Sequence, residues 1–100
     1  MPPTPEPPAT ATPVPLFTAA DIIRFALPNI DISAGTTITW TNLDGAPHTV
    51  TAGDPGAVTG EFDSGVFNLG GTYSLAFDTP GQFAYFCVIH PSMQAAVFVQ

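Results

Sequence analysis

One short segment near the C-terminus contains most of the side chains that can bind a soft metal ion. Residues 87–93 read CVIHPSM and include the only cysteine, one of two histidines and the only methionine besides Met1. The second histidine, His48, lies far upstream. A thiolate, two imidazoles and a thioether form the donor set of a mononuclear copper site in which methionine is a weak axial ligand. The sequence therefore predicts one copper ion, alternating between Cu(II) and Cu(I), with His48, Cys87, His90 and Met93 as ligands.

The spacing of these residues predicts a loop rather than a helix. Cys87, His90 and Met93 follow one another at intervals of three residues. On a helix each such step turns by about 300°, so the three side chains would diverge around the axis. A tight loop between two strands can bring them together, and Pro91 favours an extended conformation at the residue before it. His48 must then reach the same end of the fold from another loop.

Other uses of these residues are open at this stage. Zinc also accepts Cys and His, although Met93 favours copper. Carriage or storage of copper would use the same four ligands, and a metal-free β-sandwich module would leave Cys87 simply buried. An enzyme is not expected, because residues 87–93 contain no acidic side chain and no partner orients a Cys87–His90 pair.

The pattern along the chain predicts an all-β domain. Residues 36–42 (TTITWTN) alternate, with Ile38 and Trp40 inward, and 72–77 alternate in the same way. Turn residues such as 53–56 (GDPG) separate the alternating segments. We expect an antiparallel Greek-key β-sandwich or barrel of seven to eight strands, which include 21–25, 30–33, 36–42, 48–52, a short edge strand within 61–67, 72–77, 82–87 and 95–99.

Composition limits the domain organisation and the partners. Residues 1–15 contain seven prolines and predict a disordered linker, which can be a spacer to a membrane anchor or to another domain, before one folded domain at 16–100. Eight acidic residues face one basic residue, Arg24, so nucleic acid is not an expected partner. We expect an exported protein, periplasmic or extracellular, that is a monomer, and the linker allows a tether to a membrane.

The chain resembles the cupredoxins, and most of all amicyanin and plastocyanin. Residues 39–42 (TWTN) followed by Pro47-His48 look like the first ligand region of that family, and 80–87 (PGQFAYFC) look like its penultimate strand. The two-residue gap on each side of His90 is similar to the short amicyanin loop. The resemblance implies a small blue-copper electron carrier that contacts protein redox partners, such as a cytochrome, an oxidase or a dehydrogenase, near His90. A domain of a larger membrane-anchored redox protein is the alternative.

Three positions depart from the family pattern. The family usually has Asn after the first histidine and often a hydroxyl residue after the cysteine, where this chain has Thr49 and Val88. The side-chain link between the two ligand loops is therefore expected to be absent or replaced. Ile89 stands where amicyanin and plastocyanin have proline, so its N–H is available to donate to the Cys87 sulfur and to raise the reduction potential.

Overall fold

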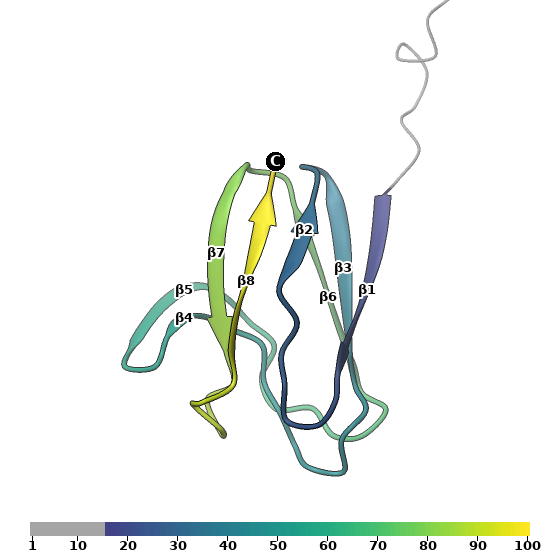
Figure 1. Ribbon diagram of the computed structural model, residues 1–100, viewed down its shortest axis with the longest axis vertical. Coiled ribbons are helices and arrows are strands. Elements are labelled where there is room, and N and C mark those ends of the chain that lie inside the picture. Colours follow the sequence, from purple (N-terminus) through teal and green to yellow (C-terminus); the bar gives the residue numbers. More distant parts are fainter. Residues whose placement is uncertain (1–15) are drawn as a thin grey trace, which may run out of the picture.

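Eight strands form two sheets that pack face to face around one core. The structure is a computed structural model that describes residues 16–100 (Figure 1), so the predicted linker at 1–15 lies outside the described residues. The smaller sheet has the order β1-β3-β6, with β1 at Leu16–Ile22, β3 at Thr36–Asn42 and β6 at Thr72–Phe77. The larger sheet has the order β2-β8-β7-β4-β5, with β2 at Ile30–Ile32, β8 at Gln94–Val99, β7 at Gly81–Phe86, β4 at Thr51–Asp54 and β5 at Ala57–Asp63. The predicted β-sandwich is confirmed.

The sheets are mixed rather than purely antiparallel. β1 runs parallel to β3, and β2 runs parallel to β8, whereas the other pairings are antiparallel. The expectation of antiparallel sheets was wrong for these two pairs. Local alternation of side chains predicts that a segment is a strand, but it carries no information on which strand lies beside it.

Residues 16–100 contain no helix long and apolar enough to cross a membrane.

The core is centred on the aromatic residues of β3 and β7. Ile38 and Trp40 are fully buried, as their alternation with outward threonines predicts. Trp40 Nε1 donates a hydrogen bond of 3.3 Å to the hydroxyl of Tyr85, which donates in turn to the carbonyl of Pro28. Burial raises the pKa of the Tyr85 hydroxyl above its ordinary value. These hydrogen bonds satisfy the polar atoms of two large buried rings and so fix how the two sheets pack.

The connections that follow β1, β3 and β7 lie at the same end of the sandwich, the lower end in Figure 1. Several strand limits differ from the prediction at this end. β1 begins at Leu16 and ends at Ile22, so residues 23–25 are not part of a strand. β4 begins at Thr51, so His48 precedes it, and β5 covers residues 57–63 rather than 61–67. The connections that follow β1 and β3 are therefore longer than the sequence predicts, and the second of them contains His48.

Candidate metal centre

The backbone of His48 is fixed by hydrogen bonds to neighbouring segments. It forms an isolated bridge with Phe67, in which each backbone N–H donates to the other carbonyl at 3.1 and 3.0 Å. Asn42, the buried last residue of β3, donates from its side chain to the carbonyls of Ala46 and Phe67, both at 2.9 Å. The loop that carries His48 is thus tied to β3 and to the chain around Phe67. The His48 side chain is completely buried.

The segment from Cys87 to Met93 is a tight loop, as its spacing predicts. The N–H of Cys87 donates to the carbonyl of Met93 at 3.1 Å, and the N–H of Met93 donates to the carbonyl of His90 at 2.8 Å. These bonds close the loop between β7 and β8 and leave Cys87 and Met93 buried while His90 stays partly exposed. The loop therefore places a thiol and a thioether inside the protein and an imidazole at its edge.

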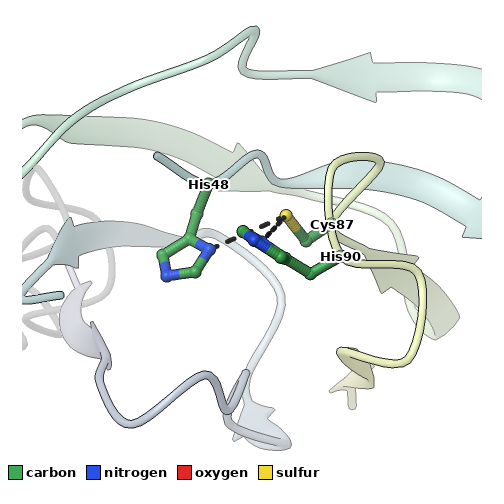
Figure 2. Close-up of side chains that lie close together, drawn as sticks. All are labelled: His48, Cys87 and His90. Atoms are coloured by element: carbon green, nitrogen blue, oxygen red, sulfur yellow. Dashed lines mark hydrogen bonds between the residues drawn. The ribbon is translucent and has the colours of Figure 1, made fainter. Parts of the chain in front are cut away.

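Three donor atoms converge from these two loops, as Figure 2 shows. The Cys87 Sγ lies 3.8 Å from Nδ1 of His48 and 3.7 Å from Nδ1 of His90. Ligand atoms of the three residues all lie within 4.8 Å of one another. Nitrogen and sulfur atoms that bind one ion at about 2.0 and 2.3 Å in a trigonal plane are themselves separated by about 3.7 Å. The donor atoms therefore have the spacing that one such ion requires.

Asp44 determines which nitrogen of His48 faces the sulfur. Its Oδ2 lies 2.8 Å from Nε2 of His48, and the Asp44 side chain is only 11% exposed. An imidazole that donates its Nε2 proton to a carboxylate keeps the lone pair of Nδ1 free for a metal. Backbone N–H donation from Phe25 holds the pKa of Asp44 below its ordinary value against partial desolvation, and His48 and the N–H of Arg24 act in the same direction. Asp44 is thus an anionic acceptor for the His48 ring.

The same carboxylate fixes an unusual turn that covers both histidines. Arg24 and Phe25 have φ angles of 57° and 55° and form the centre of a turn closed by the 3.1 Å bond from the Ala26 N–H to the Ile23 carbonyl. Asp44 accepts from the N–H of Arg24 at 2.7 Å and of Phe25 at 2.9 Å. Two successive positive φ angles are typical of a type I′ turn, which favours Asn and Gly.

The turn brings the Phe25 ring against the two imidazoles. Its centroid lies 5.2 Å from that of His48 and 5.0 Å from that of His90, with interplanar angles of 88° and 87°. Both are edge-to-face contacts of the kind that aromatic rings favour. The His48 and His90 rings themselves lie 5.1 Å apart. Phe25 therefore packs on the outside of the two imidazole rings and limits their movement.

Comparison with known proteins agrees with this geometry. Residues 16–100 match the copper-binding proteins of the plastocyanin/azurin family. The chain belongs to this family. Amicyanin-alpha of Methylorubrum extorquens is 33% identical over 78 residues, which cover 78% of this chain and 66% of that protein. The chloroplastic plastocyanin of Tetradesmus obliquus is 31% identical over 100 residues, which cover 92% of this chain and 69% of that protein.

Solved structures of related proteins have the same fold. A Cu(I) form of an amicyanin variant has a TM-score of 0.74 at 26% identity and covers 84% of this chain and 82% of its own. A purple cupredoxin from Nitrosopumilus maritimus has a TM-score of 0.73 at 31% identity and covers 82% of this chain and 98% of its own. The predicted cupredoxin fold and the copper cofactor are confirmed, and family membership supports an electron carrier rather than an enzyme.

Thr49 replaces the asparagine link that is usual in cupredoxins. Its Oγ1 accepts a hydrogen bond of 2.9 Å from the N–H of Val88, and its own N–H donates to the Cys87 Sγ at 3.4 Å. The two ligand loops are therefore joined by a hydroxyl on one side and a backbone amide on the other. In residues 16–100 no hydrogen bond from Ile89 to the sulfur is present, so the expected role of its N–H was wrong. The loop turns so that Ile89 is exposed, and the sulfur receives its backbone N–H from Thr49 instead.

Sequence reasoning missed Asp44 and Phe25. Asp44 lies in a stretch, Leu43-Asp44-Gly45, whose composition is that of any turn, and Phe25 was assigned to a strand. The one available signal for Asp44 was its position four residues before the predicted ligand His48. No local signal marks Phe25, because its conformation depends on a carboxylate about twenty residues away.

Proposed function

We propose that this cupredoxin domain is an electron carrier in which His48, Cys87, His90 and Met93 hold one copper ion. The observation that carries the proposal is the convergence of two Nδ1 atoms and a buried sulfur within 4.8 Å. When copper is bound, it supplies a one-electron couple between Cu(II) and Cu(I). The remaining functions belong to the chain itself: it holds the ligands in place, excludes water and provides a route to the surface.

Each ligand has a separate part in this arrangement. Cys87 is buried and accepts one backbone hydrogen bond, which limits how strongly its sulfur donates. His48 is oriented by Asp44, and Met93 is buried where the loop returns to β8, as suits a weak axial thioether. A ligand set that is fixed by hydrogen bonds of the protein changes little between oxidation states. This rigidity favours electron transfer over carriage, which requires release of the metal.

His90 is the route for electrons in this proposal. It is partly exposed, and the loops around it carry a set of exposed apolar side chains, here called the His90 patch: Phe25, Leu43, Pro47, Val88, Ile89 and Pro91. A small apolar contact surface suits the weak, brief encounters of electron-transfer proteins. The net charge of −7 favours a partner with a basic surface and an association that weakens with salt.

An exported location is part of the proposal. The relatives include a plastocyanin named as chloroplastic and several amicyanins. A spacer function for residues 1–15 agrees with their proline-rich composition, which suits a link to a membrane anchor or to another redox domain.

A copper titration of the metal-free protein tests the function and the ligands together. We expect one equivalent of Cu(II) to produce an intense visible thiolate-to-copper band and a narrow copper hyperfine splitting in paramagnetic resonance. Cys87→Ser must abolish the band, and Met93→Leu must retain it with a raised reduction potential. Ser92→Ala, a change in the same loop at an exposed residue, is the matched control. A colourless 1:1 complex would contradict the proposed site.

A further inference from the structure

A line of hydrogen bonds connects a surface carboxylate to the cysteine loop. Thr51 Oγ1 donates to Asp63 Oδ1 at 3.0 Å, and the hydroxyls of Thr51 and Thr49 lie 2.9 Å apart. Thr49 Oγ1 then accepts from the N–H of Val88 at 2.9 Å. Both threonines are almost completely buried, whereas Asp63 is exposed. The line therefore runs from the end of β5, through the interior, to the residue that follows Cys87.

The direction of every donor in this line is determined. An ionised carboxylate only accepts, so the Thr51 hydroxyl proton points to Asp63. Thr51 Oγ1 must then accept the proton of Thr49, and Thr49 Oγ1 accepts from Val88. Three bonds with the same direction polarise one another and strengthen the line. As a result the Thr49 hydroxyl, which could otherwise rotate, is held in one orientation.

Thr49 is the residue through which this line reaches the sulfur. Its side chain holds Val88, and its backbone N–H donates to the Cys87 Sγ at 3.4 Å. A movement of Thr49 would therefore change both contacts at once. We propose that Asp63 and Thr51 are positioning residues for the copper centre, which act through Thr49 to fix the hydrogen bond to the sulfur. This inference rests on the proposed function, because it takes the Cys87 sulfur to be the copper ligand.

The surroundings of Asp63 are consistent with a fixed acceptor. Its Oδ1 also accepts from the N–H of Gly65 at 3.0 Å. The neighbouring Ser64 forms two hydrogen bonds with Val50, the residue directly before β4, of 2.7 and 2.9 Å. The carboxylate is thus held against the larger sheet although it faces solvent. It anchors the line at the surface, so the orientation of the buried hydroxyls does not depend on water.

Loss of the line should change the electronic properties of the site. In Thr51→Val the Thr49 hydroxyl loses its acceptor and becomes free to rotate, which weakens its bond to Val88 and the contact of the Thr49 amide with the sulfur. A sulfur with a weaker hydrogen bond donates more strongly and favours Cu(II). The reduction potential should therefore fall and the visible band should shift.

The test compares the copper-loaded variants Thr49→Val, Thr51→Val, Asp63→Ala and Asp63→Asn. We expect the first three to lower the potential, Thr49→Val most, and Asp63→Asn to stay near the parent, because an amide oxygen also accepts from Thr51. The double variant Thr49→Val, Thr51→Val should fall no further than Thr49→Val alone. Thr39→Val is the matched control, because its hydroxyl forms a 2.7 Å bond with Ser74 in the other sheet.

Two results would overturn the inference. One is an unchanged potential and band in Thr51→Val and Asp63→Ala, even if both variants melt at lower temperature. The other is an equal shift in Thr39→Val. If Thr51→Val does not fold, the potential of Asp63→Ala alone tests the inference, because that substitution is at an exposed residue.

Failure of the proposed function would appear differently, as the absence of a blue band in the parent protein. In that case hydrogen exchange of backbone amides in the metal-free protein tests whether the line of hydrogen bonds fixes Thr49 and Val88. Exchange at Val88 and Thr49 must become faster in Thr51→Val but not in Thr39→Val.

Discussion

The two candidate ligand histidines offer equivalent nitrogen atoms from very different surroundings. His48 is fully buried, its backbone is paired with Phe67, and Asp44 fixes its ring. His90 is partly exposed in a loop, and within residues 16–100 no hydrogen bond to its Nε2 is present. The structure thus builds one histidine into the fold and leaves the other at the surface. In the proposed copper site the first would secure the position of the metal, and the second would be available for electron exchange.

The largest expected effect comes from removing each ring in turn. His48→Gly and His90→Gly should both weaken copper binding by more than the ~100-fold that loss of an outer hydrogen-bond partner costs. Added imidazole should restore the blue band in His90→Gly, whose cavity opens to solvent, but not in His48→Gly. Visible titration with and without imidazole measures this. Equal rescue of both variants would show that added imidazole reaches both cavities equally well. Thermal melting of the metal-free variants is the control for folding.

Removal of the Asp44 carboxylate should have the next largest effect. Asp44→Ala deprives the His48 Nε2 of its acceptor and releases the two backbone N–H groups of the Arg24–Phe25 turn. Copper affinity should fall by about 10–100-fold, as is usual when the partner of a ligand histidine is lost. Competition with a chelator measures the affinity. Asp78→Ala, which removes the same charge from an exposed residue, is the control, and an equal loss in it would point to net charge instead.

The sequence predicts the features that depend on local patterns but not those that depend on contacts between distant segments. The four candidate ligands could be proposed because Cys87, His90 and Met93 lie in one short segment and only one other histidine exists. Strands such as 72–77 were found because alternation is a local property. Asp44 was not found because its stretch has the composition of any turn, although it lies only four residues before His48. Phe25 was not found because its conformation depends on a carboxylate about twenty residues away. The link from Thr49 to Val88 and the parallel pairing of β1 with β3 were missed for the same reason.

Loss of the Phe25 ring should have a smaller effect, concentrated on His90. His48 has Asp44 and its bridge to Phe67, whereas His90 depends more on its 5.0 Å contact with Phe25. Phe25→Ala should lower the stability of the metal-free protein by about 1 kcal/mol, the size of an aromatic pair interaction. NMR of the ring protons should show broadening at His90 and little change at His48. Phe17→Ala, at an exposed phenylalanine near the start of β1, is the control. Equal broadening at both histidines would contradict the inference that His90 depends more on Phe25 than His48 does.

The smallest expected effect tests whether the turn formed by Arg24 and Phe25 is strained. A positive φ is costly for residues with a Cβ and is easily adopted by glycine, so Arg24→Gly, at a φ of 57°, should raise the free energy of unfolding by about 0.5–1 kcal/mol. It should leave the copper spectrum unchanged, because Asp44 and the Phe25 ring both remain. Phe25→Gly relieves the same kind of strain at a φ of 55° but removes the ring. If Arg24→Gly is more stable and leaves His90 unchanged, while Phe25→Gly disturbs His90, the strain is the cost of holding an aromatic ring against the exposed histidine. If Arg24→Gly is less stable instead, the Arg24 side chain contributes more than the strain removes, and the turn needs another explanation.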